Sequence, residues 1–185
     1  MIRLIVLAFH DIFLNSGMLS VKLIIAFLYS NEELFERVKN SCENVWDDCD
    51  FVSEKYDFNM TDYYQNEMGA SLLRRFISFE KLIHPDELAE IKILCNLIEK
   101  QYSQENNRQI NIDPGYMDRD KLVLASVKYG RQKISIGKNI WADPVLYYYK
   151  KNFQAMDWTF PDFKTQRYDN ELKLIRNLYK KKLRQ

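Results

Sequence analysis

The run VKLIIAFLY at residues 21–29 decides the fold of this chain. Lys22 is its only charged residue, and its Val, Ile, Phe and Tyr residues favour strands. A strand with one exposed face alternates polar and apolar residues, whereas this run is apolar almost throughout. We therefore expect residues 21–29 to form a central strand with both faces buried.

One helix and two strands are predicted next along the chain. Ser30 and Glu33 have the spacing of a capping box, and the apolar residues after them recur at helical spacing, which predicts a helix over residues 31–46. Residues 51–58 alternate weakly between apolar and polar, and residues 72–82 do so more clearly. These two segments predict the second and third strands.

A second helix and a fourth strand complete the first half. Pro85 suits the first position of the helix, where its missing N–H costs nothing. The apolar stripe of this helix consists of Leu88, Ile91, Leu94, Cys95, Ile98 and Tyr102. Residues 109–113 predict a short strand. The order β-α-β-β-α-β predicts an α+β fold on the ferredoxin-like plan, with two helices on one face of an antiparallel sheet.

The second half predicts a β-meander and a third helix. Strand-like runs cover residues 122–128, 133–136 and 140–149, and Gly130 and Gly137 suit the turns between them. A C-terminal helix follows, with an apolar stripe formed by Tyr168, Leu172, Ile175, Tyr179 and Leu183.

The chain shows no linker or repeat, so we expect residues 18–185 to form a single domain. Residues 1–17 carry an apolar run that is too short to span a bilayer and lacks the cleavage site of a signal peptide. They precede a second possible start at Met18, and we expect a disordered extension or, alternatively, an added edge strand.

Composition limits the function. The net charge of +1 gives no overall field to attract nucleic acid or an anionic membrane, and no membrane partner is expected. Cys42, Cys49 and Cys95 lie in helix-like or apolar patterns and indicate reduced thiols, hence a cytoplasmic location. With His10 and His84 as the only histidines, a zinc site or a Ser-His-Asp triad is disfavoured, and no metal is expected.

Motifs for nucleotides and RNA are incomplete. A P-loop needs G-x-x-x-x-G-K-[ST], but upstream of Gly137 the chain has Gln132 in place of the first glycine, and Asn139 replaces the hydroxyl residue. A dinucleotide G-x-G-x-x-G is missing as well. Residues 74–79 lie where an RNA-binding sheet stacks bases, but they lack the glycine and have Ser78 in place of a ring. Nucleic acid is therefore disfavoured as a partner.

The stretch NIDPGYMD, residues 111–118, has two interpretations, one structural and one functional. Asp113-Pro114-Gly115-Tyr116 fits a type II turn, because Pro sets φ at the second position and Gly supplies a positive φ at the third. Asp113 either only starts this turn or is held by it at a strand end, where Asn111 and Tyr116 would join it around a ligand.

The segment TDYYQNEMG, residues 61–69, is dense in polar and aromatic groups. Thr61, Tyr63, Tyr64 and Glu67 supply hydroxyls, rings and a carboxylate within one connection, a pattern found both in pockets and at packing edges.

Two cations elsewhere suit an anion. Arg75 lies on the third strand, where its neighbour Arg74 faces the opposite side, and Lys128 ends a later strand. A surface ion pair and a solvated lysine are the simpler interpretations of these residues.

Five segments of the chain resemble, in order, the motifs of a bacterial family catalogued as domain of unknown function 4416: TDYYQNEMGASLLRRFISFEKLI, LAEIKILCNLIE, NIDPGYM, KLVLASVK and WTFPDF. The resemblance implies a cytoplasmic bacterial protein with no established activity. Some members are labelled GTP-binding, which would need the missing P-loop, and members often have His where this chain has Met60. The family motifs fall on Thr61, Tyr63, Tyr64, Glu67, Met68, Gly69, Arg75, Asn111, Asp113, Pro114, Gly115, Tyr116, Lys128, Trp158, Thr159, Pro161 and Asp162.

The leading hypothesis is a pocket where residues 61–69, the Asp113 turn and residues 158–163 converge on an anionic, phosphorylated or nucleotide-like small molecule. If the protein is an enzyme, Asp113 or Glu67 would act as the general base. No cofactor is indicated. The ligand-binding residues predicted are Thr61, Tyr63, Tyr64, Arg75, Asn111, Tyr116, Lys128, Thr159 and Asp162.

The alternative hypothesis is a noncatalytic interaction module. In this case the aromatic residues 147–149 and Trp158 would be exposed and would bind a protein partner or a second copy of the chain.

Overall fold

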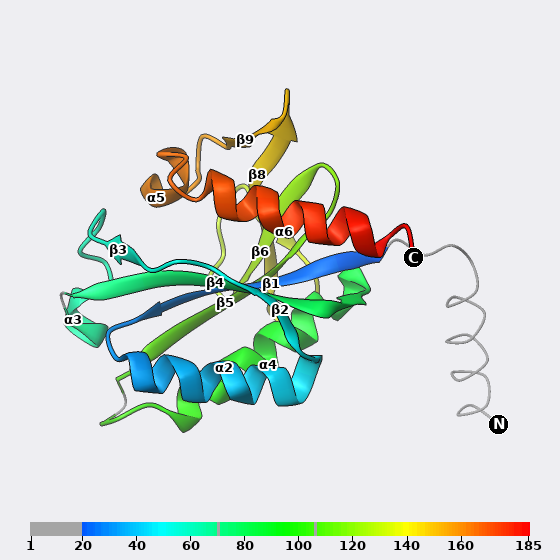
Figure 1. Cartoon of the computed structure of the whole chain (residues 1–185). Coiled ribbons are helices and arrows are strands. Elements are labelled where there is room, and N and C mark those ends of the chain that lie inside the picture. The colour runs from blue at the N-terminus through cyan, green and yellow to red at the C-terminus, as the bar shows by residue number, and fades with distance from the viewer. Residues whose placement is uncertain (1–19, 70, 106) are drawn as a thin grey trace.

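A nine-stranded sheet is the frame of the fold (Figure 1). The computed structural model describes residues 20–69, 71–105 and 107–185, so the expectations for residues 1–17 lie outside the described residues. The strands are β1 (Val21–Tyr29), β2 (Cys49–Val52), β3 (Tyr56–Phe58), β4 (Leu72–Ile83), β5 (Ile110–Met117), β6 (Lys121–Ser126), β7 (Ile134–Ser135), β8 (Trp141–Tyr149) and β9 (Asn152–Ala155).

The strands follow the order β2-β4-β1-β5-β6-β8-β7, with β3 paired to β4 and β9 paired to β8. The pairings are antiparallel, and together with the helices they confirm an α+β fold. The helices of the described residues are α2 (Glu32–Trp46), α3 (Gln65–Met68), α4 (Leu88–Gln101), α5 (Pro161–Lys164) and α6 (Asp169–Lys182), and a 3-10 turn at Pro85–Glu87 leads into α4.

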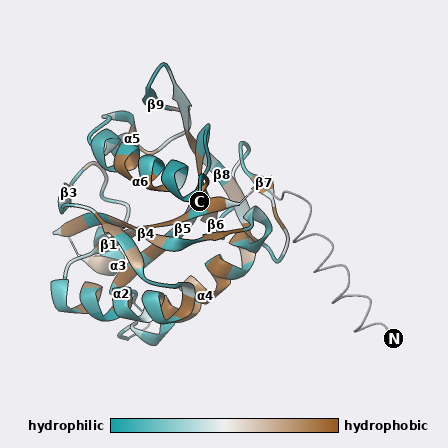
Figure 2. Ribbon diagram, turned by 45° about the vertical axis from the view of Figure 1, so that its right-hand side comes forward, coloured by the Kyte–Doolittle hydropathy of each residue, from teal (hydrophilic) through white to brown (hydrophobic). Residues whose placement is uncertain are grey.

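Strand β1 lies between two layers of helices, which explains its apolar sequence. Figure 1 shows α2 and α4 on one side of the sheet and α5 and α6 on the other. The side chains of Leu23 and Ile25 pack in the core with α2 and α4, whereas Ile24 and Ala26 pack in the core with α5 and α6. Figure 2 shows the hydrophobic residues concentrated on the central strands. The prediction that residues 21–29 form a central buried strand is confirmed.

Two predicted details near the start of the fold are wrong. The N-cap of α2 is Asn31, whose side chain accepts the amide of Leu34 at 3.0 Å, and not Ser30. The single strand predicted over residues 51–58 is divided into β2 and β3. The division follows Ser53, whose hydroxyl takes the place of a carbonyl and accepts the amide of Phe76 at 2.8 Å.

The predicted meander has a different order in space. Strand β8 pairs with β6 on one side and with both β7 and β9 on the other, so β7 is an edge strand and does not separate β6 from β8. The strand β9 and the short helices α3 and α5 were not predicted. Each is four residues long, too short for a periodic pattern to be recognised.

The predicted type II turn at Asp113–Tyr116 is also wrong, because β5 runs straight through it. Residues 110–117 of β5 pair with β1 along its length. Gly115 lets β6 approach closely, since a Cβ at this position would lie 2.3 Å from the carbonyl oxygen of Val123. Pro114 has no N–H, and at its position this group would point away from β1. Pro114 and Gly115 therefore shape the contact between β5 and β6.

Candidate functional site

The sheet is open between the first half of β5 and β6. Strand β6 pairs with β5 at residues 115–117, so the outer backbone edge of β5 before Gly115 has no strand partner in the described chain. Two side chains of α4 satisfy this edge instead. Glu99 Oε1 accepts the amide of Ile112 at 2.6 Å, and Lys92 Nζ donates to the carbonyl oxygen of Ile112 at 2.8 Å.

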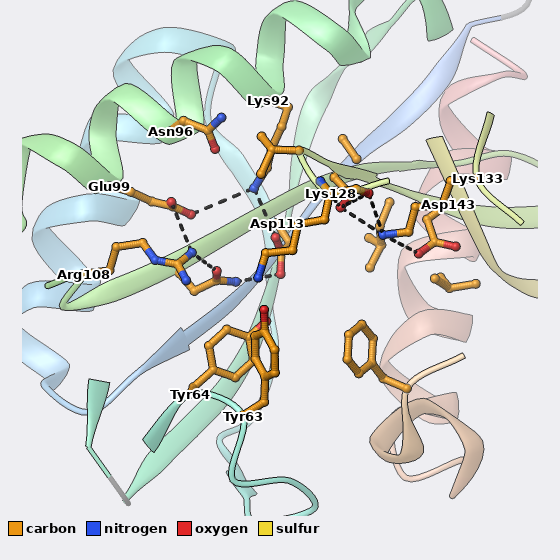
Figure 3. A pocket seen from close by; sticks show the side chains of 17 residues that line it. Tyr63, Tyr64, Lys92, Asn96, Glu99, Arg108, Asp113, Lys128, Lys133 and Asp143 are labelled. Carbon is orange, nitrogen blue, oxygen red and sulfur yellow. Dashed lines mark hydrogen bonds and ion pairs between the residues drawn. The ribbon is translucent and has the colours of Figure 1, made fainter. Parts of the chain in front are cut away.

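A pocket of about 150 Å³ lies at this gap (Figure 3). Its walls come from α4, β5, the end of β6, β8 and the loop that leads into α3. The lining residues are Tyr63, Tyr64, Lys92, Asn96, Glu99, Arg108, Asn111, Asp113, Leu124, Ala125, Ser126, Val127, Lys128, Lys133, Asp143, Val145 and Phe160.

Asp113 is held on both carboxylate oxygens. Lys92 Nζ lies 3.1 Å from Oδ1, and the side-chain Nδ2 of Asn111 donates to Oδ2 at 2.6 Å. Burial alone would raise the pKa of Asp113, but the charges of Lys92 and Arg74 hold this pKa below its ordinary value. Asp113 is therefore an ionised carboxylate that has one partner on each oxygen.

Glu99 differs from Asp113 in the bonding of its oxygens and in the direction of its pKa shift. Its Oε1 is bonded to the amide of Ile112, while Oε2 lies 3.6 Å from Arg108 Nη1, beyond hydrogen-bond distance. Lys92 Nζ is 4.0 Å from Oε1. Burial raises the pKa of Glu99 above its ordinary value, and Lys92 offsets this effect only in part. Glu99 is thus the pocket carboxyl group better suited to exchange a proton.

Arg108 ties the aromatic wall of the pocket to β5. Its Nε and Nη2 donate to the two carboxylate oxygens of Glu67 at 2.6 and 2.7 Å, and its Nη1 donates to Asn111 Oδ1 at 2.7 Å. Glu67 lies in α3, the short helix that begins directly after Tyr63 and Tyr64. Burial raises the pKa of Tyr64 to about 12, and the charge of Asp113 adds to the rise, so its hydroxyl stays protonated at neutral pH.

Two lysines from the segment after β6 also line the pocket. Lys128 Nζ lies 4.5 Å from the centre of the Tyr63 ring, a cation–π contact. Lys133 Nζ lies 3.3 Å from Asp143 Oδ2 and donates to Ser126 Oγ at 3.0 Å. The second oxygen of Asp143, Oδ1, is buried and has no hydrogen-bond partner in the described part of the chain.

The structure brings together some of the residues that the sequence predicted for the site. All three predicted segments contribute to the pocket, the last of them through Phe160. The predicted residues that line it are Tyr63, Tyr64, Asn111, Asp113 and Lys128.

The other predicted residues lie elsewhere. Arg75 is on the α2 side of the sheet, 2.8 Å from Glu32 Oε1 and over the ring of Phe35. Thr159 is buried and donates to the carbonyl oxygen of Val145 at 2.5 Å. The remaining ones are outside the lining as well. Glu67 pairs with Arg108, and Tyr116 packs against the apolar cluster that contains Leu88 and Val123. Thr61 accepts the backbone amide of Tyr63, and Asp162 lies 3.3 Å from Arg74.

The sequence interpretation missed the two α4 residues that matter most. Lys92 and Glu99 stand seven positions apart, and Cys95 between them belongs to the apolar stripe of the helix. Two charged residues on the helix face that carries the apolar stripe therefore indicate a polar site between this helix and the sheet. Arg108, in the polar connection after α4, carries no comparable signal.

The aromatic residues named in the interaction-module hypothesis differ in their exposure to solvent. Tyr147 and Tyr149 are 41% and 57% exposed, whereas Tyr148 packs against Phe153. Trp158 is half-exposed and donates from Nε1 to the carbonyl oxygen of Pro144 at 2.9 Å.

Within the residues that the structure describes, no three His, Cys, Asp or Glu side chains are grouped as metal ligands. No helix of residues 20–69, 71–105 and 107–185 combines the length and the apolar character needed to cross a membrane.

Comparison with known protein families gave a match over most of the chain. The family model described as "Domain of unknown function (DUF4416)" matches residues 19–179. Searches of curated proteins and of solved structures found no match.

Proposed function

The chain belongs to the DUF4416 family, whose description states no activity, and we propose that it binds an anionic small molecule in the pocket between α4, β5 and β6. Lys92 and Arg108 have carboxylate partners, and so does Lys133. Lys128 is the exception: within the described residues its Nζ contacts the Tyr63 ring and forms no ion pair. This ammonium at the pocket wall, which has no carboxylate partner among the described residues, is the observation that carries the proposal.

Charged and aromatic groups line the pocket together. The lining contains four cations, Lys92, Arg108, Lys128 and Lys133, and three carboxylates, Glu99, Asp113 and Asp143, while Glu67 outside the lining pairs with Arg108. The rings of Tyr63, Tyr64 and Phe160 offer faces and edges to a planar group. A phosphorylated or nucleotide-like ligand fits this combination of a free cation and aromatic rings.

Two further proposals concern the fold plan and the location of the protein. The order β5-β1-β4-β2, with α2 and α4 on one side, is what a ferredoxin-like split βαβ core requires, and we propose that plan for the first half of the chain. We also propose a cytoplasmic location, which the free thiols of Cys42, Cys49 and Cys95 support.

The proposal is tested by comparing two lysine variants. Lys128→Ala removes the free cation, while Lys138→Ala removes a half-exposed lysine that pairs with Glu90 outside the pocket. Calorimetric titration with inorganic phosphate, adenosine 5′-monophosphate and glycerol 3-phosphate is expected to detect binding to the wild type. Affinity should fall about tenfold in Lys128→Ala, the loss of one charge-assisted contact, and should not change in Lys138→Ala. Absence of binding by the wild type, or equal affinity in Lys128→Ala, would contradict the proposal.

The interaction-module hypothesis is the second candidate, and the exposure of Tyr147 and Tyr149 favours it. It predicts that the mass measured by light scattering rises with protein concentration and that Tyr149→Ser removes this rise. A constant monomer mass would eliminate self-association through this face.

A further inference from the structure

Glu99 offers one free oxygen to the pocket. The residue is only 5% exposed, yet it lines the pocket, and Figure 3 shows its carboxylate extending from α4 toward β5. Oε1 is fixed by the amide of Ile112, whereas Oε2 has Arg108 Nη1 at 3.6 Å and accepts no hydrogen bond from the described residues. Oε2 is not among the fully buried oxygens of the described residues that lack a partner, so it is accessible from the pocket, and a hydroxyl group of a ligand would reach it there.

The neighbours of Glu99 decide what kind of donor fits. Lys92 Nζ lies 4.0 Å from one carboxylate oxygen and Arg108 Nη1 lies 3.6 Å from the other. These two cations would repel a ligand ammonium, but they leave the hydrogen bond from a neutral hydroxyl unopposed. Burial raises the pKa of Glu99, and the charges of Lys92 and Arg108 offset this rise only in part.

The free cation and the free acceptor belong to different walls. Lys128 follows β6, whereas Glu99 and its neighbour Asn96 line the pocket from α4. A ligand that touches both walls therefore needs an anionic group for Lys128 and a hydroxyl group for Glu99. An alkyl anion would satisfy only one of these walls.

We propose that the ligand is a hydroxylated anion, such as a polyol phosphate, a sugar phosphate or a hydroxy acid, and that its hydroxyl donates to Glu99 Oε2. This inference rests on the proposed function, because it takes Lys128 as the site of the anionic group. It deepens that function by stating a second chemical requirement on the same ligand.

The test uses pairs of probes that differ only in their hydroxyl groups. These are glycerol 3-phosphate with propyl phosphate, lactate with propionate, and adenosine 5′-monophosphate with its 2′,3′-dideoxy form. Calorimetric titration should show that the hydroxylated member of at least one pair binds the wild type about tenfold more tightly, the effect of one hydrogen bond to a charged group. Phosphoethanolamine, which carries an ammonium in place of a hydroxyl, should bind no better than propyl phosphate.

Two variants of α4 identify the residue responsible. Glu99→Gln keeps an oxygen for the amide of Ile112 and removes the carboxylate charge, so the preference should fall to about threefold or less. Glu90→Gln is the control, because Glu90 lies on the same helix and pairs with Lys138 outside the pocket, and the preference should persist in it.

The outcomes separate the two claims. Equal binding of both members of every pair, with Lys128→Ala still weakening them, overturns the hydroxyl inference and leaves anion binding intact. An unchanged preference in Glu99→Gln, or stronger binding of phosphoethanolamine, also overturns it. If no probe binds the wild type, the proposed function fails and the inference fails with it.

Discussion

The two halves of β5 satisfy their outer edge in different ways. Residues 115–117 pair with β6 in an ordinary antiparallel ladder, whereas Ile112 in the first half is bonded by the side chains of Glu99 and Lys92. A ladder leaves no room between strands, but side chains that reach across from a helix leave space beside them. The pocket thus lies where two charged α4 residues take the place of a strand partner for β5.

The largest expected effect comes from adding a side chain where β5 pairs with β6. Gly115→Ala would place its Cβ 2.3 Å from the carbonyl oxygen of Val123 and 2.7 Å from a methyl group of Leu124. Because a backbone atom cannot move aside easily, we expect a loss of about 3 kcal/mol or more in the free energy of unfolding. Urea denaturation measures it. Gly130→Ala is the control, since its Cβ would meet flexible side-chain atoms at 3.1–3.3 Å; equal losses in the two variants would contradict this account.

In the open half, Asp113→Asn removes the charge that balances Lys92. Lys92 is almost fully buried, and we expect a loss of about 2 kcal/mol at pH 7, as for other buried charged pairs that lose one partner. The pKa of Asp113 is lowered in the folded state, so its contribution is present above its ordinary value of 3.8 and is lost as the pH falls through the lower folded pKa. The difference between wild type and variant, measured by urea denaturation, should be constant from neutral pH down to about 5 and vanish in acid.

A double-mutant cycle checks that the pair is responsible. If Lys92→Met is combined with Asp113→Asn, the double variant should lose less stability than the sum of the single variants, because neither charge is left alone. Simple additivity would show that Asp113 contributes through other contacts.

A smaller effect is expected where the aromatic wall is tied to β5. Glu67→Gln loses the bidentate pair with Arg108, whose hydrogen bonds hold the pKa of Glu67 low. Both side chains are about one-third exposed, so solvent screening limits the loss to about 0.5–1 kcal/mol. Amide exchange in residues 61–69 should become faster, whereas Glu36→Gln on α2 should leave it unchanged. Unaltered exchange in Glu67→Gln would mean that packing alone holds Tyr63 and Tyr64.

The smallest effect is expected at the neighbour of Gly115. Pro114→Ala adds an N–H that points into the gap beside β5, where no strand competes for the space. We expect a change of about 0.5 kcal/mol, mainly from the greater freedom of the unfolded chain. Thermal denaturation of both adjacent variants makes the comparison direct: a loss at Pro114 as large as that at Gly115 would show that the two halves of β5 are equally constrained.

The candidate site was predicted only in part. The pattern of polar and aromatic residues identified Tyr63, Tyr64, Asn111, Asp113 and Lys128, because dense polar groups in short connections are visible along the chain. Arg75 was misplaced, since alternation along a strand indicates that neighbours face opposite sides but not which side holds the pocket. Asp113-Pro114-Gly115 predicts a turn, although it lies within β5, because Pro and Gly are favoured both in turns and where a strand loses its partner.

The sequence by itself determined the α+β class, the buried central strand at residues 21–29 and the helices α2, α4 and α6. These depend on hydrophobic periodicity, which is a local property of the chain. Only the tertiary structure decided where β5 and β6 separate, which pocket carboxylate keeps an oxygen without a hydrogen bond from the described residues, and which pocket lysine contacts a ring and forms no ion pair with them. Those outcomes depend on contacts between residues far apart in the sequence, such as Glu99 with Ile112 and Lys133 with Asp143, and on the burial that shifts their pKa values.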